Sequence, residues 1–502
     1  MLYLYRTKLT IHIAKMKNLS FFSVIIFLVV FINPSFSQSI SNGFSVNTSG
    51  FSSAILTDYQ TVGLNPANLG WKRNDNLINF GIAQMNYSVY SEPLKRTLVR
   101  ELFNEKETAF SQDEKDDAAQ RFTDTKLQFE GNVSGLGISF QDEKIGGFGL
   151  AIRERVMWNS TFSESISNIM FKGYNASYFD SLAVNIEGDT TGWATNPQLA
   201  SDILENTKIS LVWYREYNLS YGRSILNSEN ISIYGGLGIK YIEGYNLLNF
   251  SYEEGGDYVA YTAVNPAIGI TFGSSPSRVD NNRYQAIGHG WGIDIGLSAF
   301  LFQHIRVAVS VLDIGEIKWD KNVYVIKNDF VKNIEDEGMN SFNIFDLQNT
   351  EAFENLKWGG WEGVESHTTQ LPMNLRTGAA YILKKKYEFG VEMYVPLNES
   401  PGAYDKILIG GGARLMPVNW FRGSVGVVSG GNTGTSVPVG ISFFPFNRSS
   451  FTWEIGIATN DITTYFQQEK PTVSLAFGLF RFSFGNLAKN ETPNTSNDTI
   501  SN

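Results

Sequence analysis

The sequence predicts an all-β protein, a closed antiparallel transmembrane β-barrel with about 14 strands. Three observations lead to this prediction. Apolar and polar residues alternate over most of the chain, the alternating stretches mostly reach about ten residues, and most follow one another through short turns. Strands of soluble proteins usually have about five or six residues, whereas about ten tilted residues cross a bilayer. Long paired strands in this number therefore favour a barrel in a membrane.

Residues 289–300, HGWGIDIGLSAF, illustrate the alternation. Every second residue from Trp291 to Ala299 is apolar, and glycine, Asp294 and Ser298 lie between them. A membrane barrel places such an apolar face against lipid, whereas a soluble sheet places it against a core. The alternating stretches and further candidate strands are 77–90, 129–140, 145–158, 208–223, 231–251, 258–272, 289–300, 305–311, 319–327, 371–383, 387–395, 405–415, 419–428, 436–444, 453–458 and 472–485. Merged or split, they give about 14–16 strands, and a slip of phase near Leu479 predicts a β-bulge.

The polar face carries charges of both signs. We expect nine charged side chains to face the lumen: Asp294, Arg306, Glu388, Glu392, Lys406, Arg414, Arg422, Glu454 and Arg481. A two-sheet sandwich would expose them to water, but closure into a barrel also removes the edge strands that would otherwise aggregate. An ion-selective pore would organise such charges at a constriction. We favour the alternative, in which they pair with one another and with the N-terminal segment and hold the lumen closed.

The N-terminus predicts export. From Met16 the chain reads MKNLSFFSVIIFLVVFINPSFSQ, with a lysine, an apolar run and then small residues at Ser35 and Ser37. This is the pattern of a signal peptide, 1–37, preceded by an over-long start, 1–15. The apolar run is too short to span a bilayer comfortably. Export combined with a barrel predicts the outer membrane of a Gram-negative bacterium, with its lipid as a partner.

Several segments lack the alternation of strands. Residues 38–75 are small and polar, and residues 76–485 form the expected barrel. Residues 94–126 have apolar residues at helical spacing, which predicts one or two surface helices. The inserts 160–207 and 328–365 read as a long loop and a partly helical long loop, and we place all three inserts on the outer side. In the last of them, Phe353, Trp358 and Trp361 form either a small loop core, which we favour, or a contact for an apolar ligand or partner. The tail, 486–502, is rich in Asn, Thr and Ser and is expected to be disordered.

Composition excludes several classes of function. The 502 residues include no cysteine, which excludes disulfides, thiolate metal sites and a cysteine nucleophile. The net charge of −10 argues against nucleic acid as a partner. His289, His304 and His367 lack metal-ligand spacing, and no GxSxG motif is present. We therefore expect no catalytic residue, metal or cofactor, and no enzyme. The glycine clusters at 235–238, 409–414 and 428–434 are not followed by GKS or GKT; inside a barrel they give curvature or room for a plug.

Residues 61–69, TVGLNPANL, resemble the Asn-Pro-Ala motif of FadL-like outer-membrane barrels. The motif maps to Asn65, Pro66 and Ala67, and Asn68 stands where members often have glycine. The resemblance implies that residues 38–75 fold inward as a hatch, that the barrel has fourteen strands, and that it transports small apolar compounds. The same tripeptide recurs at 265–267, inside an apparent strand.

A second resemblance covers residues 290–319, GWGIDIGLSAFLF followed after two residues by IRVAVSVLDIGEIKW. It is similar to the signature of an uncharacterised FadL-like family, known only as a domain of unknown function. Relatives in this broad group include transporters and accessory barrels of secretion or assembly machines. Two functions therefore stay open: uptake or binding of small apolar compounds, with a wall opening near Pro396, Pro417 or Pro438, and a scaffold subunit with protein partners in a membrane complex.

Overall fold

The computed structural model describes residues 45–72, 76–103, 109–252, 258–268, 272–279, 283–343, 361–384 and 386–485. The chain divides into Met1–Ser35 and Phe36–Asn502, and every described residue belongs to the second unit. The predicted signal peptide, the tail 486–502, Phe353 and Trp358 lie outside the described residues. No helix in the described part is long and apolar enough to cross a membrane.

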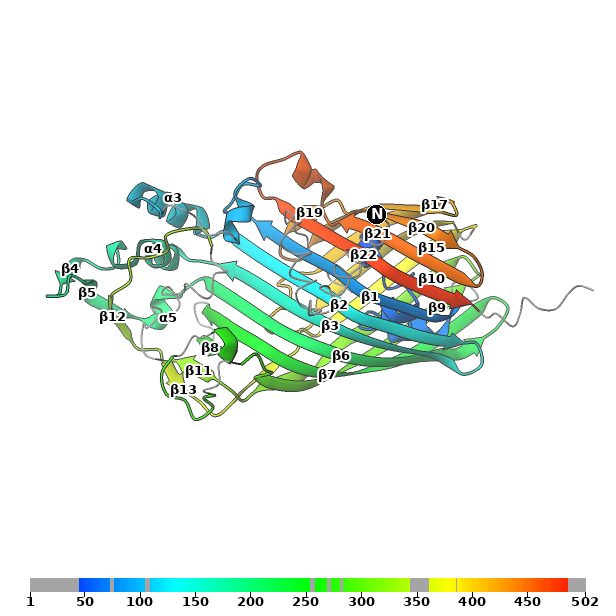
Figure 1. Ribbon diagram of the computed structural model, residues 1–502, viewed down its shortest axis with the longest axis horizontal. Helices are drawn as coiled ribbons and strands as arrows, with labels where there is room; N and C mark the ends of the chain where they lie inside the picture. The colour runs from blue at the N-terminus through cyan, green and yellow to red at the C-terminus, as the bar shows by residue number, and fades with distance from the viewer. Residues whose placement is uncertain are drawn as a thin grey trace, which may run out of the picture. The chain divides into compact units, whose positions relative to one another are not determined.

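Within the described residues, fourteen antiparallel strands close into a barrel (Figure 1). The wall strands are β1 (Asn76–Ser91), β2 (Lys126–Asp142), β3 (Gly146–Thr161), β6 (Thr207–Asn227), β7 (Ile231–Tyr252), β9 (Gly288–Leu301), β10 (Ile305–Trp319), β15 (Asn374–Leu383), β16 (Tyr387–Pro396), β17 (Leu408–Val418), β18 (Phe421–Gly430), β20 (Val439–Asn447), β21 (Phe451–Thr459) and β22 (Thr472–Gly485). Each pairs with the next wall strand, and β1 pairs with β22 to close the ring. The predicted fold class is confirmed.

Shorter elements join these strands. They are the 3-10 helices η2 (Ser45–Thr48), η3 (Asp58–Thr61), η4 (Pro66–Gly70), η5 (Val99–Leu102), η6 (Gly173–Asn175), η7 (Pro266–Ile268) and η8 (Ile462–Tyr465), and the strands β8 (Val259–Ala263), β11 (Val323–Ile326), β13 (Trp361–Gly363), β14 (His367–Gln370) and β19 (Gly434–Ser436). The predicted strands 258–272 and 319–327 correspond to the short β8 and β11, which pair with each other beyond the wall.

The wall is apolar outside and polar inside. On β9, Trp291, Ile293 and Leu297 are 63%, 43% and 53% exposed, whereas Asp294 and Ser298 are buried. The same exposed face continues around the ring through Ile138, Phe148, Leu219, Leu237, Ile239, Val309, Tyr381, Val391, Ile409, Val427, Phe443, Ile457 and Phe480. A protein in water would reverse these faces, so the arrangement is that of a barrel surrounded by lipid.

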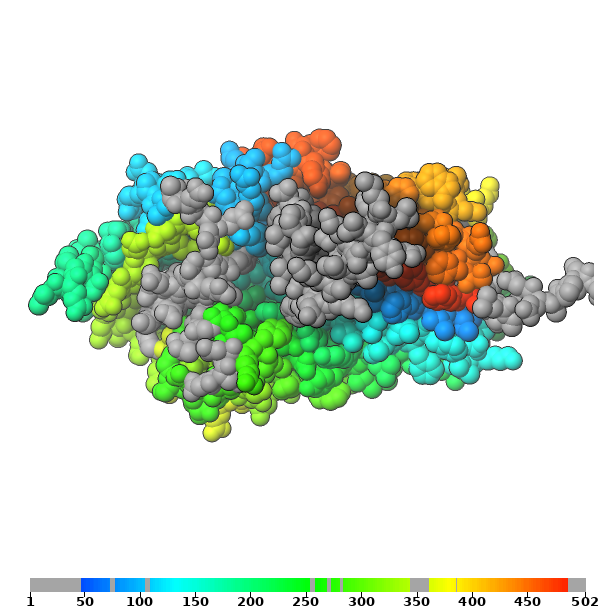
Figure 2. Space-filling view, in the orientation of Figure 1, coloured from blue at the N-terminus to red at the C-terminus, as the bar shows by residue number. Residues whose placement is uncertain are grey.

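The two ends of the barrel differ in the length of their connections. At one end, the turn end, strands are joined by two or three residues, as at 143–145, 302–304 and 419–420. At the other, the loop end, the connections include the three predicted inserts. Figures 1 and 2 show the inserts gathered at this end. Bacterial barrels keep their long loops on the outer side.

The inserts form one small domain rather than separate loops. It contains α3 (Gln112–Phe122), α4 (Glu164–Lys172), α5 (Ala200–Ile203) and a sheet in the order β12 (Phe330–Ile334), β5 (Thr190–Leu199), β4 (Ser181–Val184). Their apolar residues share one core, which includes Phe110, Phe122, Phe162, Ile169, Phe171, Ile203, Val331 and Phe342. The described parts of 328–365 contain the strands β12 and β13 and no helix. β12 instead pairs with β5, which belongs to another insert. Trp361 packs against the same core, as a loop-core residue would.

The β-bulge predicted near Leu479 is confirmed. The register of β21 and β22 shifts between the pairs Glu454–Arg481 and Gly456–Gly478. The indole nitrogen of Trp453 donates a hydrogen bond of 2.9 Å to the carbonyl of Leu479, which the bulge frees from the ladder.

Candidate functional site

The N-terminal segment, residues 45–72, lies inside the barrel. Its residues 51–62 are all buried. On eleven wall strands, a Cβ added to one glycine would come within 3.0 Å of the segment. These glycines are Gly81, Gly137, Gly149, Gly222, Gly236, Gly296, Gly378, Gly390, Gly410, Gly426 and Gly440. The wall therefore presents backbone and no side chain at these positions, which leaves space for the segment. Two of the glycine clusters noted in the sequence, 235–238 and 409–414, contribute glycines to this set.

Asn65 begins the turn that docks the segment on β9. Its Oδ1 accepts from the amide of Ala67 at 3.1 Å, which caps η4, and Pro66 follows as the first helical residue. Its Nδ2 donates to the carbonyl of Leu297 and to Ser298 Oγ, at 3.2 and 3.0 Å. The tripeptide therefore makes a local turn and a contact with the wall.

The second copy forms the same turn in another place. Asn265 Oδ1 accepts from the amide of Ala267 at 3.1 Å, and η7 follows. Residues 265–267 thus follow β8, which ends at Ala263, and are not inside a strand as the alternation suggested. The tripeptide encodes a capped turn in both copies, and only Asn65 uses it inside the lumen.

Ionic and aromatic contacts also hold the segment. Arg481 Nη2 lies 2.7 Å from Asp58 Oδ2, and Glu392 Oε2 accepts from the amide of Ser53 at 2.9 Å. The guanidinium of Arg306 lies 4.1 Å from the centre of the Trp71 ring. Three of the nine side chains expected in the lumen thus contact the segment.

The structure places eight of these nine side chains on the inner face. Among the others, Arg414 Nε lies 2.6 Å from Glu388 Oε2 and Arg422 Nη1 lies 2.9 Å from Glu454 Oε1. The assignment of Lys406 was wrong. It is exposed and lies in the loop before β17, which begins at Leu408 rather than at residue 405, so alternation does not apply to it.

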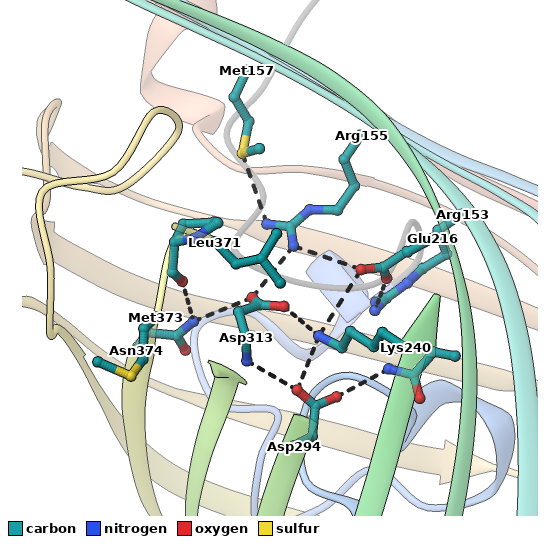
Figure 3. Close-up of polar contacts among 12 residues, drawn as sticks. Arg153, Arg155, Met157, Glu216, Lys240, Asp294, Asp313, Leu371, Met373 and Asn374 are labelled. Atoms are coloured by element: carbon teal, nitrogen blue, oxygen red, sulfur yellow. Dashed lines mark hydrogen bonds and ion pairs between the residues drawn. The ribbon is translucent and has the colours of Figure 1, made fainter. Parts of the chain in front are cut away.

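A second set of charges fills the lumen beside the segment (Figure 3). This ionic cluster consists of Arg153, Arg155, Glu216, Lys240, Asp294 and Asp313, from β3, β6, β7, β9 and β10. Lys240 Nζ lies 2.9 Å from Asp294 Oδ1 and also contacts Asp313, and Arg155 Nη1 lies 3.5 Å from Asp313 Oδ2. Arg153 pairs with Glu216. Three cations therefore face three carboxylates, and the buried charges balance.

The ionic cluster touches the segment on one side and an apolar layer on the other. A Cβ on Gly63 would collide with the guanidinium of Arg153, and Ser310 Oγ donates to the carbonyl of Leu64 at 2.7 Å. Toward the loop end, Ile242, Trp319 and Leu371 belong to one buried apolar cluster. Charges held between two water-excluding layers interact strongly with one another.

Sequence reasoning identified only Asp294 in this cluster. Glu216 and Lys240 lie at inward positions of β6 and β7, and alternation within those strands was the signal that would have found them. Asp313 gave no such signal, because it lies in a bulge of β10 with φ of 60°, from which its amide donates to Asp294 Oδ1.

A loop from the far wall crosses the lumen. Residues 397–407, the crossing loop, join β16 to β17, and β16 lies seven strands from β2 in the ring of fourteen. Yet Tyr404 Oη donates to Glu130 Oε2 on β2 at 2.8 Å. Asp405 pairs with Lys208 of β6 and, at 3.5 Å, with Lys126 of β2. Burial alone would raise the pKa of Asp405, but the two lysines hold it below its ordinary value.

A cavity of about 30 Å³ separates the segment from the crossing loop. Gly63 of the segment lines one side, and Gly402, Ala403 and Tyr404 of the loop line another. The wall contributes mainly polar side chains: Gln128, Glu130, Asn132, Arg153, Arg155, Asn159, Asp313, Asn374, Arg376 and Tyr394. A cavity of about 60 Å³ lies beside the segment, among residues that include Asp58, Lys72, Arg422 and Arg481.

The model of a family of unknown function, DUF5723, matches residues 66–448. The chain belongs to this family. No curated protein matches the sequence. The match includes residues 290–319, which predicted membership of a family known only as a domain of unknown function, and that expectation is confirmed.

This DUF5723 protein is similar to several solved structures. A TodX deltaS2S3 mutant monoaromatic hydrocarbon channel has 10% identity over 89% of this chain and 100% of that chain, with a TM-score of 0.45. A FadL homologue of Pseudomonas aeruginosa has 8% identity over 90% and 99%, with a TM-score of 0.40. The CymD monoaromatic hydrocarbon channel has 11% identity over 89% and 97%, with a TM-score of 0.38. The barrel is established by the pairing of its own strands, from β1 through β22 and back to β1.

The histidines of the DUF5723 protein lie apart from the ionic cluster. His289 Nδ1 is 2.8 Å from Tyr241 Oη on the wall, His304 lies in an exposed turn, and the ring of His367 packs on Tyr261. Among the described residues, no group of three or more His, Asp or Glu side chains is placed to hold a metal ion.

Proposed function

We propose that this protein is an outer-membrane barrel that takes up a small compound, with the N-terminal segment as its hatch. The apolar exterior supports a site in lipid, and the separation of short turns from long loops supports an orientation with the loop end outward. The predicted signal peptide supports export. The proposal describes a non-enzymatic protein.

The observation that carries the proposal is the fit of the segment to the wall. Eleven wall strands have a glycine where the segment passes, so the space that the segment occupies is shaped by the wall to receive it. Asp58 forms an ion pair with Arg481, and hydrogen bonds such as those of Ser53 with Glu392 and Asn65 with Ser298 also join the segment to the wall. A closure that fits its surroundings by shape and is not covalently continuous with the wall strands is suited to movement as one body.

A disulfide that locks the segment tests the proposal. Ser49 Oγ donates to Ser424 Oγ of β18 at 2.8 Å, and the chain has no cysteine of its own. The double variant S49C/S424C therefore places two thiols within bonding reach. The matched control is S429C/T435C, whose hydroxyls are also 2.8 Å apart but join β18 to β19 without touching the segment.

We expect oxidation of S49C/S424C to reduce solute passage through proteoliposomes by about tenfold or more, since the hatch is then fixed. A reductant should restore passage, and the control pair should show no change in either state. Passage that is equal in the oxidised and reduced lock would contradict a role of the segment as hatch.

A scaffold role is the second candidate, and one observation favours it. The β4–β5 hairpin at the loop end exposes Leu182, Val184 and Ile186, at 55%, 67% and 107%. Exposed apolar side chains that cluster on a monomer often mark a contact with another protein. Native mass spectrometry of the protein purified from outer membranes separates the candidates: a stoichiometric protein partner favours the scaffold, and a monomer with a bound small molecule favours uptake.

A further inference from the structure

We infer that the cavity between the N-terminal segment and the crossing loop is a binding compartment for a small polar solute, and that the crossing loop is its outer lid. This inference rests on the proposed uptake function and names the chemical class of its cargo. It departs from the apolar cargo that the FadL resemblance implies.

The side chains that line the compartment indicate the chemical class of the solute. Five ionisable side chains other than tyrosine contribute to it: Glu130, Arg153, Arg155, Asp313 and Arg376. An apolar compound in this space would separate these groups from water and from one another without replacing any hydrogen bond. A polar solute exchanges its hydrogen bonds with water for hydrogen bonds with the wall.

Two buried polar atoms in the lining favour a ligand that both donates and accepts. Asn374 and Arg376 are 3% and 4% exposed. Among the described residues, Asn374 Oδ1 and Arg376 Nε have no hydrogen-bond partner. Both side chains line the cavity. Buried polar groups are almost always satisfied, so one acceptor and one donor that share a cavity indicate a polar occupant.

The volume shows that the compartment is closed in this state. A cavity needs about 10–15 Å³ to hold one water molecule, so a volume of about 30 Å³ has room for only about two or three. A sugar or an amino acid needs more room, so one boundary has to move. The wall strands are paired in a closed ring, which leaves the segment and the crossing loop as the movable boundaries.

The crossing loop has the attachments of a lid. Its end rests on the opposite wall through the Tyr404–Glu130 hydrogen bond and the Asp405 ion pairs rather than through a strand ladder. The side chains of Asp405, Lys126 and Lys208 are 25%, 29% and 42% exposed, so these pairs are partly hydrated and exchange with water at little cost. Gly402 packs on Met157 and Val212 of β3 and β6.

The test compares passage of polar solutes with binding of an apolar one. Full-length protein in liposomes is assayed for swelling in isosmotic glycine and in arabinose. Tyr404→Phe removes the hydroxyl that fastens the lid, and we expect it to speed swelling about threefold or more in both solutes. The control is Tyr465→Phe, which changes an exposed tyrosine of η8 in another loop and should leave the rate unchanged.

Asn374→Leu tests the lining, since it keeps the branched shape of the side chain and removes the unpaired acceptor. We expect it to slow swelling about threefold or more. In parallel, binding of radiolabelled toluene to the protein in nanodiscs is measured against empty nanodiscs, and we expect no saturable binding.

Each outcome bears on the inference. The inference is supported if Tyr404→Phe speeds swelling, Asn374→Leu slows it, and toluene shows no saturable binding. Saturable toluene binding without polar swelling overturns the polar class and leaves the uptake function standing. Swelling that Tyr404→Phe does not change overturns the lid. No swelling and no toluene binding in any variant overturns the uptake function itself and this inference with it.

Discussion

Replacing Lys240 with methionine tests whether the ionic cluster holds the barrel together as a unit. Lys240 is 1% exposed and contacts Asp294, Asp313 and, at 3.9 Å, Glu216. Lys240→Met keeps the length of the side chain and leaves three buried carboxylates with two guanidinium groups. Removing one member of a buried ion pair costs about 3–5 kcal/mol, because the remaining charge stays out of water without compensation. We expect a loss of that size in the free energy of unfolding.

The double variant Lys240→Met/Asp294→Asn separates the cluster from simple packing. It removes one cation and one carboxylate, so the buried charges balance again. We expect it to be more stable than the sum of the two single variants by about 2–3 kcal/mol, the upper part of the range for groups in contact. The exposed Lys318 supplies a control, since Lys318→Met should change stability by no more than about 0.5 kcal/mol.

Urea unfolding of the barrel in lipid vesicles, followed by tryptophan fluorescence, measures these differences, because the chain has 10 tryptophans. If the two single variants add within about 0.5 kcal/mol, the charges act independently and the view of the cluster as one unit is refuted.

Three further predictions concern the hatch, the wall and the lid. Gly426→Ala places a methyl group against the segment and should expose the segment to protease from the turn end. Gly135→Ala should not, because its methyl group lies 3.9 Å from the carbonyl of Ile152, an ordinary contact; equal cleavage would contradict the fit. Ile295→Lys puts a charge on the outer face and should cost about 2–4 kcal/mol of unfolding free energy in lipid, whereas Ile186→Lys at the fully exposed hairpin should change stability little, and a tolerated Ile295→Lys would argue against lipid on that face. Because its folded pKa is depressed, Asp405 keeps the lid attached above the ordinary carboxyl value of 3.8 and releases it as the pH falls through the lower folded value. Hydrogen exchange of residues 397–407 should therefore accelerate only in that acidic window, and Asp405→Asn should abolish the dependence.

The barrel could be predicted because the alternation of apolar and polar residues is a local property of each strand. Alternation assigns each residue of 289–300 to one face without reference to any distant contact, and the structure has Trp291 exposed and Asp294 buried. Alternation assigned Lys406 wrongly, because the alternating pattern continues before Leu408, where the strand β17 begins. The ends of β17 depend on hydrogen bonds with its neighbours, which alternation does not contain.

The candidate site was only partly predictable because its geometry depends on distant contacts. Asp294 was found from its strand, but its partner Lys240 lies 54 positions earlier and meets it only when β7 and β9 pair. In the sequence, residues 396–404 are only the connection between the predicted strands 387–395 and 405–415. The local sequence does not predict that Tyr404 contacts Glu130, 274 positions away. That contact depends on the diameter of the closed ring, which no short stretch of sequence determines.

The two closures of the lumen differ in kind, and this difference predicts their order of opening in the proposed mechanism. The N-terminal segment is buried over residues 51–62 against bare backbone and is tied by the buried Asp58, so moving it uncovers much surface at once. The crossing loop is held at its tip by the buried hydrogen bond of Tyr404 and by the half-hydrated pairs of Asp405, so it detaches from the opposite wall at smaller cost. We therefore expect the lid to open first and to admit solute from the loop end while the hatch stays shut. The hatch then moves only after the polar groups of the compartment have exchanged their contacts with one another for contacts with the solute. In this order the barrel is never open at both ends at once.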